Sequence, residues 1–170
     1  GCLNAAYREI SPPMELPAAK VYADQHTFAF MDAGQVNPGH VIVATRQQLE
    51  TILDLDDELA GALFRTAARV ARAVDAAFHP EGITVLQANK PAGWQTVPHF
   101  HIHVLPRHKD DGVGLTWPRR NPDIAELRLA KAETGVEYGR LRYQDAAALA
   151  EIEFELAKKR QEAFSEFTAP

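Results

Sequence analysis

The chain has 170 residues, of which 46% are hydrophobic and 24% charged, a balance typical of a folded soluble protein rather than a disordered chain. Its net charge of -5 excludes a general basic surface for nucleic acid, and it contains no apolar run of membrane-spanning length. The single cysteine, Cys2, excludes an internal disulfide framework, and the first residues lack the pattern of a secretory signal. We therefore expect one domain, residues 1–170, in the cytoplasm, without a nucleic acid or membrane partner.

Short runs rich in β-branched and aromatic residues predict four strands in about the first half of the chain. These runs lie at residues 20–24, 27–32, 39–45 and 83–86. Pro38-Gly39 marks the turn into the third strand, because these two residue types favour turn conformations. Residues 1–18 contain three prolines and no sustained period, so an irregular lead-in is expected there.

Apolar residues at three- and four-residue steps predict two amphipathic helices, at residues 54–78 and 144–167. Asp54 or Asp56 can cap the first helix, because a carboxylate at that position accepts from the free N–H groups of the first turn. The first helix is expected to pack on the sheet, and the second on the sheet or against a second subunit. Residues 113–143, which prolines interrupt, receive no assignment.

The stretch from His99 to Arg107 carries the most chemical information in the sequence. Successive side chains of a strand point to opposite faces, so a strand here has three histidines on one face and apolar residues on the other. The two sets are His99, His101 and His103, and Phe100, Ile102 and Val104. A purely structural strand gains nothing from a row of groups that need hydrogen-bond partners and titrate near neutrality. The first face is therefore predicted to be chemical and the second to belong to the core.

Two chemistries could use such a face. Two histidines two residues apart on a strand are a common pair of zinc ligands, although a metal site would need a further ligand from elsewhere. A neutral imidazole is also a nucleophile toward phosphorus, and neighbouring imidazoles can bind the anionic oxygens or move protons. Gln95 and Thr96 place an amide and a hydroxyl just before the strand, and no carboxylate or cysteine lies close by in sequence. These neighbours favour the chemistry at phosphorus.

At these residues the sequence resembles the histidine-triad (HIT) nucleotide hydrolases and transferases. The resemblance rests on Gln95-Thr96-Val97-Pro98-His99-Phe100-His101-Ile102-His103-Val104-Leu105-Pro106-Arg107 and on the upstream Asn37-Pro38-Gly39-His40-Val41-Ile42-Val43. It spans about residues 21–112 and leaves residues 113–170 as a C-terminal extension. It implies an α+β fold of the HIT type, with an antiparallel sheet of about five strands, a packing helix and a C-terminal helix.

The resemblance also implies catalytic roles. His101 is expected to attack the α-phosphorus of a dinucleoside polyphosphate or nucleoside phosphoramidate and form a covalent nucleotidyl-histidine, from which water releases a nucleoside monophosphate. His103 and His40 would stabilise the phosphate or move protons, and His99 would support the arrangement. Gln95 and Thr96 would orient the phosphate or assist the leaving group; these two and the four histidines are the candidate catalytic residues.

Nucleotide binding is expected from other residues. Asp32 lies where the family has a group that binds the ribose hydroxyls, although a carboxylate that merely caps a turn fits equally well. Gln87, Asn89 and Gln95 are further candidates; the usual amide of the family falls between the first two, at Ala88.

The resemblance further implies a purine nucleotide substrate and a homodimer, with no required cofactor. The family's structural zinc is expected to be absent, because Ala5 and Gln48 stand where two of its ligands would be, and a divalent cation can accompany the substrate. Pro98 and the ending Leu105-Pro106-Arg107 look nearer the fragile-histidine-triad branch, the dinucleoside polyphosphate hydrolases, than the phosphoramidases called Hint.

Two other functions remain open. A zinc hydrolase would use His99, His101 and His40 as ligands and would lose activity on chelation. A non-catalytic nucleotide-binding protein would bind mononucleotides without a covalent intermediate.

Overall fold

The computed structural model describes residues 19–116, 118–142, 150, 154–155 and 157–162. Contacts within the chain group it into two compact units, residues 1–114 and 115–170. Among the described residues, no helix is long and apolar enough to span a membrane. The expected single domain over the whole chain stays a prediction.

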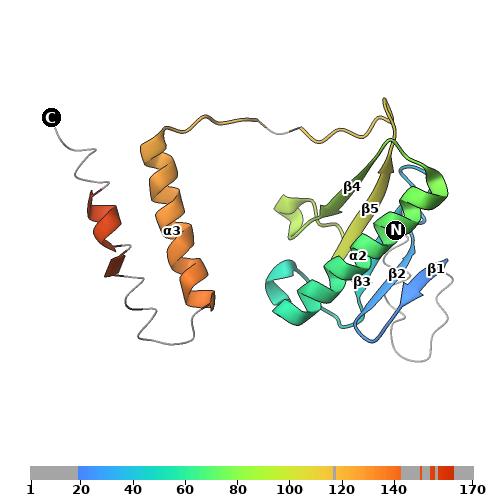
Figure 1. Cartoon of the computed structure of the whole chain (residues 1–170), viewed down its shortest axis with the longest axis horizontal. Helices are drawn as coiled ribbons and strands as arrows, with labels where there is room; N and C mark the ends of the chain where they lie inside the picture. Colours follow the sequence, from blue (N-terminus) through green and yellow to red (C-terminus); the bar gives the residue numbers. More distant parts are fainter. Residues whose placement is uncertain (1–18, 117, 143–149, 151–153, 156, 163–170) are drawn as a thin grey trace. The chain divides into compact units, whose positions relative to one another are not determined.

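A five-stranded sheet forms the first unit (Figure 1). Its strands are β1 (Lys20–Ala23), β2 (Thr27–Met31), β3 (Val41–Thr45), β4 (Gly82–Gln87) and β5 (His101–Arg107). They are ordered β1-β2-β3-β5-β4, and every neighbouring pair is antiparallel. The predicted α+β fold with five antiparallel strands is therefore confirmed, and β5 lies inside the sheet, between β3 and β4.

The register between β3 and β5 separates chemical from apolar side chains. Directly opposed residues of an antiparallel pair share a face. Ile42 is opposite His103 and Ala44 is opposite His101 on one face, while the alternate pairs join Val41 to Val104 and Val43 to Ile102 on the other. The alternation read from the triad thus gives a core face and a histidine face, as expected for those positions.

Helix α2 (Asp57–Phe78) packs on the apolar face of the sheet, against β2, β3 and β5. Its buried side chains join strand residues in one core; the cluster comprises Ala29, Val41, Val43, Leu59, Leu63, Ala67, Val70, Val74, Phe100, Ile102 and Val104. Asp56 caps the helix, because its carboxylate accepts from the N–H of Leu59 at 2.7 Å. Asp54 instead ends a short 3-10 turn, η1 (Ile52–Asp54), so the helix begins three residues later than predicted.

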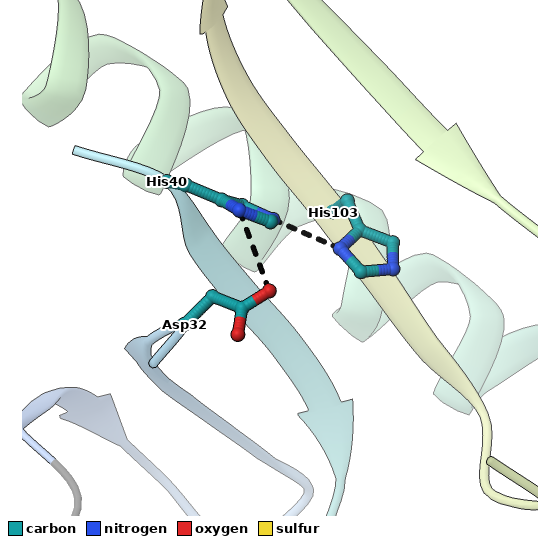
Figure 2. Close-up of side chains that lie close together, drawn as sticks. All are labelled: Asp32, His40 and His103. Carbon is teal, nitrogen blue, oxygen red and sulfur yellow. Dashed lines mark hydrogen bonds and ion pairs between the residues drawn. The ribbon is translucent and has the colours of Figure 1, made fainter. Parts of the chain in front are cut away.

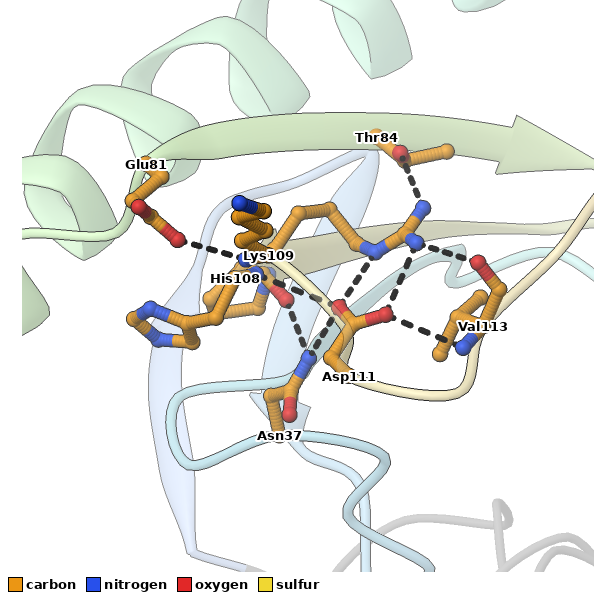
Figure 3. A network of polar contacts seen from close by, with 9 residues as sticks. Asn37, Glu81, Thr84, His108, Lys109, Asp111 and Val113 are labelled. Atoms are coloured by element: carbon orange, nitrogen blue, oxygen red, sulfur yellow. Dashed lines mark hydrogen bonds and ion pairs between the residues drawn. The ribbon is translucent and has the colours of Figure 1, made fainter.

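A polar network fixes the end of β5 and the turn after it (Figure 3). The guanidinium of Arg107 donates to both oxygens of Asp111, at 2.7 and 3.0 Å, and also to Thr84 and to the Val113 carbonyl. Asp111 accepts as well from the Asn37 amide, at 2.9 Å, which joins the turn to the loop before β3. The hydrogen bonds from the Arg107 side chain, helped by those from the Val113 and His108 backbone, hold the pKa of Asp111 far below its usual range. The N–H groups of Arg107 that these contacts use are therefore bound within the fold.

Replacing Asp111 with asparagine is expected to destabilise this unit. The change removes the negative charge that neutralises Arg107 and leaves the amide unable to accept all the hydrogen bonds that the carboxylate accepts. The melting temperature should fall by roughly 5 °C or more, measured by circular dichroism. Asp110→Asn, in the same turn but outside the network, is the control. An equal change in both variants would contradict the structural role of Asp111.

The described part of the second unit contains helix α3 (Ile124–Arg142). Asp123 accepts from the N–H of Glu126 at 2.8 Å and so satisfies a free donor at the start of the helix. The sequence left this segment unassigned because prolines precede it and no apolar stripe at helical spacing runs along it. The predicted helix over residues 144–167 falls largely outside the described residues. The described residues within that range, 150, 154–155 and 157–162, are helical.

Candidate functional site

The central histidine of the triad, His101, begins β5 and is 7% exposed. Its Nδ1 lies 2.6 Å from the backbone carbonyl oxygen of His99. A carbonyl oxygen only accepts, so Nδ1 must carry the proton of a neutral imidazole and Nε2 must carry the lone pair. The backbone therefore holds His101 in the tautomer that a nucleophile needs.

His99 lies just before β5 and is anchored to the end of β3 at Thr45. Its Nε2 donates to the backbone carbonyl of Thr45 at 2.7 Å and lies 2.9 Å from the Thr45 hydroxyl, while Nδ1 lies 3.2 Å from the Gln48 amide oxygen. The predicted supporting role fits these contacts, because the anchored residue supplies the carbonyl that orients His101. The strand itself begins at His101, so the sheet carries two of the three expected histidines.

Gln48 bears on the expected absence of the family's structural zinc. Its amide nitrogen donates to the Pro98 carbonyl at 3.0 Å, so this side chain joins the residues that precede β5. Cys2 and Ala5 lie outside the described residues, and the expected absence of zinc stays a prediction.

The buried His99 makes the stability of the fold sensitive to acid. Burial, together with the nearby His101, lowers the pKa of His99 to about 4. Between pH 6.5 and that value the unfolded chain takes up a proton that the folded chain does not, so stability present above 6.5 is lost as the pH falls. From about pH 7 to about pH 5 the loss should be roughly 2 kcal/mol for this residue, measured by urea unfolding.

His99→Gln should make the pH dependence shallower by the His99 contribution, since glutamine does not titrate, although the variant is less stable near pH 7 and the contribution of His103 remains. The control is His79→Asn at the exposed end of α2. A slope in His99→Gln as steep as in the parent protein would contradict the assignment.

His40 lies between Asp32 and His103 on the face opposite α2 (Figure 2). Its Nε2 is 2.9 Å from Nδ1 of His103, and its Nδ1 is 3.3 Å from a carboxylate oxygen of Asp32. Burial, with the neighbouring His101 and His40, lowers the pKa of His103 to about 4. Burial also lowers the pKa of His40, opposed by the charge of Asp32 and by the Gly34 backbone. Both rings are therefore neutral near pH 7.

The loop that carries Asp32 and His40 is held by Gln35, which the sequence analysis did not identify. Its amide oxygen accepts from the N–H groups of Gly39 and His40, at 2.9 and 3.1 Å. Its amide nitrogen donates to the carbonyls of Asp32 and His40, at 2.6 and 2.8 Å. A glutamine in a loop has no distinguishing sequence pattern, so only the folded backbone reveals this role.

Asp32, His40 and His103 each offer an atom that could bind a metal, and these atoms lie within 4.8 Å of one another. The hydrogen-bonded nitrogens of the two histidines already face each other, so an ion between them would have to replace that bond. The ligand set expected for a zinc hydrolase was different. Two of its donors, Nε2 of His99 and Nδ1 of His101, are directed at backbone carbonyls.

Gln95 and Thr96, the two predicted site residues just before β5, differ in whether their side chains are hydrogen-bonded. Gln95 donates to the Glu50 carbonyl at 2.6 Å and accepts from the Lys90 N–H at 2.6 Å, so both ends of its amide hold the loop. This loop contains the short turn η2 (Pro91–Gly93). Thr96 is exposed, and within the described residues its hydroxyl has no hydrogen bond.

Gln87 and Asn89, the other predicted nucleotide contacts, bind each other. The Gln87 amide nitrogen lies 3.0 Å from Asn89 Oδ1, and the Asn89 amide nitrogen lies 2.6 Å from Gln87 Oε1. Asn89 also accepts from the N–H of Ile52 at 2.7 Å. Gln87 is opposite Ile102 in the sheet, on the face that α2 covers. The structure thus brings together Asp32, His40, His101 and His103 but leaves this pair outside that group.

The comparisons with known proteins agree with the fold. The family model for the HIT domain matches residues 14–110. A crystal structure of a HIT family member from Bacillus subtilis has a TM-score of 0.69 and 30% sequence identity, and the match covers 85% of this chain and 96% of that one.

Two relatives are named by activity. The bis(5'-adenosyl)-triphosphatase of Dictyostelium discoideum is 37% identical over 91 residues, 53% of this chain and 60% of the relative. The adenosine 5'-monophosphoramidase of Schizosaccharomyces pombe is 28% identical over 105 residues, 61% of this chain and 76% of the relative. Both kinds of activity appear, so the expected position nearer the fragile-histidine-triad branch stays a prediction. The family model, which matches more than half of the chain, shows that this protein belongs to the HIT domain family.

Proposed function

We propose that the protein is a nucleotide hydrolase or nucleotidyl transferase that cleaves at the α-phosphate through a covalent nucleotidyl-histidine. The tautomer of His101 carries this proposal, because its Nδ1 is bound to the His99 carbonyl and its Nε2 is left as a nucleophile. The names of the two relatives support dinucleoside polyphosphates and nucleoside phosphoramidates as substrate classes.

In the first step Nε2 of His101 attacks the α-phosphorus. A phosphorus–nitrogen bond forms while the bond from phosphorus to the leaving oxygen or nitrogen breaks. The leaving group departs with the electron pair, and a leaving nitrogen also takes up a proton from solvent water. Negative charge spreads over the non-bridging oxygens, so positioned donors lower the barrier most. The protein has a net charge of -5, so attraction of the anionic substrate must arise locally at the site.

In the second step water attacks the same phosphorus and releases the nucleoside monophosphate, and His101 returns to its neutral form. A base must take the proton of that water. His103 is the nearest candidate, because its ring lies edge-on to the ring of His101 with 4.9 Å between the ring centres. His40 supports His103 through the contact at 2.9 Å.

The other predicted contacts differ in whether their polar groups are already hydrogen-bonded. The exposed hydroxyl of Thr96 can bind phosphate, whereas Gln95, Gln87 and Asn89 would first have to give up bonds within the loop. Asp32 remains a candidate for the ribose. A purine base, a homodimer and a divalent cation that accompanies the substrate stay expectations of the resemblance.

Intact-protein mass spectrometry tests the proposal. The full chain is mixed with diadenosine triphosphate or with adenosine 5'-phosphoramidate, quenched without acid because nucleotidyl-histidine is labile, and assayed in parallel for AMP release with a chelator present. An adenylyl adduct that maps to His101 and forms with the chelator present is expected. The faster substrate then identifies the branch of the family.

The alternatives give different results. Activity that appears only with zinc, without an adduct, would indicate a metal hydrolase. AMP binding without an adduct or turnover on either substrate would indicate a nucleotide-binding protein.

A further inference from the structure

His40 and His103 share a proton whose position decides which of their other ring nitrogens carries a lone pair, and its role rests on the proposed function. A neutral imidazole has one N–H and one lone pair. The facing nitrogens, Nε2 of His40 and Nδ1 of His103, lie 2.9 Å apart and can share only one proton when both rings are neutral. Two arrangements satisfy this contact, and they leave opposite groups on the far side of each ring.

The surroundings of His40 distinguish the two arrangements. Its far nitrogen, Nδ1, is buried and lies 3.3 Å from a carboxylate oxygen of Asp32. Within the described residues this nitrogen has no hydrogen bond; the Asp32 carboxylate lies in ion-pair contact with it, and the Gly34 backbone also acts on the His40 ring. A lone pair there would face a negative charge at low exposure, whereas an N–H would be attracted to it. The proton of His40 therefore belongs on Nδ1.

The orientation of the Asp32 carboxylate is itself fixed. One oxygen accepts from the backbone N–H of Gly34 at 2.9 Å, and the other faces His40 (Figure 2). The side chain is 14% exposed. The Gln35 amide holds the backbone on both sides of this contact, at the carbonyls of Asp32 and His40. These contacts aim the carboxylate at the ring of His40 and leave little of it exposed.

We propose that Asp32 is a positioning residue that fixes both tautomers, so that His103 presents an unprotonated Nε2 to the nucleotide and His40 stores the proton it receives. With Nδ1–H on His40, its Nε2 must accept, and Nδ1 of His103 must donate. The free Nε2 of His103 then carries a lone pair. This assignment makes His103 a base toward the attacking water.

Nε2 of His103 gains a proton from the water as the oxygen bonds to phosphorus and the bond from phosphorus to His101 breaks. The Nδ1 proton of His103 passes to Nε2 of His40. His40 becomes the imidazolium, and its positive charge lies beside the carboxylate of Asp32 rather than beside the ring of His101. Among the described residues, Asp32 and His101 are the neighbours whose charge acts on this pair.

Nitrogen-15 NMR of the full chain tests the tautomers directly. Spectra of histidine-labelled protein near pH 7.5 separate protonated from unprotonated ring nitrogens, and His40→Gln and His103→Gln assign the signals. Protonated Nδ1 and unprotonated Nε2 are expected on both rings. A His40 protonated at Nε2 would overturn the inference, whether or not the protein turns over a substrate.

Kinetics of Asp32→Asn separate the positioning role from ribose binding. Asparagine keeps an oxygen for the Gly34 N–H and can still bind a hydroxyl, but it removes the charge. For adenosine 5'-phosphoramidate and its 2',3'-dideoxy analogue alike, kcat should fall by roughly 10- to 100-fold, with little change in KM. With diadenosine triphosphate, whose phosphate leaving group needs no proton, the adenylyl adduct should accumulate because the water step is slowed.

Asp110→Asn, which also removes one negative charge but at an exposed position, is the matched control and should behave as the parent protein. A loss confined to KM, and absent for the dideoxy substrate, would assign Asp32 to the ribose and overturn the inference. A parent protein without turnover on any of these substrates would instead refute the proposed function, and the NMR result would still decide the tautomers.

Discussion

Replacing His101 with asparagine is expected to lower kcat by about 10⁴-fold or more, while AMP continues to bind. The asparagine amide can still donate to the His99 carbonyl, as Nδ1 of His101 does at 2.6 Å, so the local backbone should keep its conformation. The variant has no nitrogen lone pair with which to attack phosphorus. Turnover is measured by AMP release, binding by titration calorimetry, and the adenylyl adduct by mass spectrometry.

The matched control is His79→Asn. His79 ends α2 in the left-handed conformation, with φ 48°, which asparagine tolerates better than most residues. The control changes the same residue types at an exposed position and should retain full activity. Turnover of His101→Asn comparable to that of the control would remove His101 as the nucleophile, and loss of AMP binding together with turnover would indicate a damaged pocket instead.

The sequence predicted the sheet well because its signals are local. Alternation along the strands gave their places, and the three apolar partners of the triad, Phe100, Ile102 and Val104, all lie in the core. The sequence did not fix the first residue of α2, because Asp54 and Asp56 both fit a capping position and only the folded chain distinguishes them. Helix α3 was missed because no apolar stripe at helical spacing marks it.

The candidate site was predictable in its residue types but not in its hydrogen bonds. His40 and the triad stand out by pattern and spacing. The tautomer of His101 depends on a backbone carbonyl, and the anchoring of His99 depends on Thr45, which is 54 residues away in sequence. Asp32 appeared as either a ribose ligand or a turn cap. Its contact with His40 depends on the folded conformation of the loop, which Gln35 holds, and so cannot be read from the sequence.

Gly39, which directly precedes His40, gives the second large prediction: Gly39→Ala should destabilise the fold by about 3–5 kcal/mol. The residue has φ +94°, outside the conformations that residues with a side chain readily adopt. A Cβ would also lie 2.6 Å from Cδ2 and 2.9 Å from Cγ of Phe78, too close to the base of the ring for a small rotation to relieve. Both costs arise in the turn that sets the position of His40, so kcat should fall as well.

A double-mutant cycle separates these two costs. Phe78→Ala removes the ring that the new Cβ would meet, and it should be mild alone because Phe78 is 43% exposed. In the double variant the crowding is relieved, whereas the backbone strain at residue 39 remains. The double variant should therefore regain about half of the free energy of unfolding that Gly39→Ala loses. Urea unfolding measures both variants. No recovery would assign the whole cost to the backbone, and an unchanged stability of Gly39→Ala would contradict both the φ value and the contact. The physical reason for a glycine before His40 is thus the combination of a positive φ and the close approach of α2.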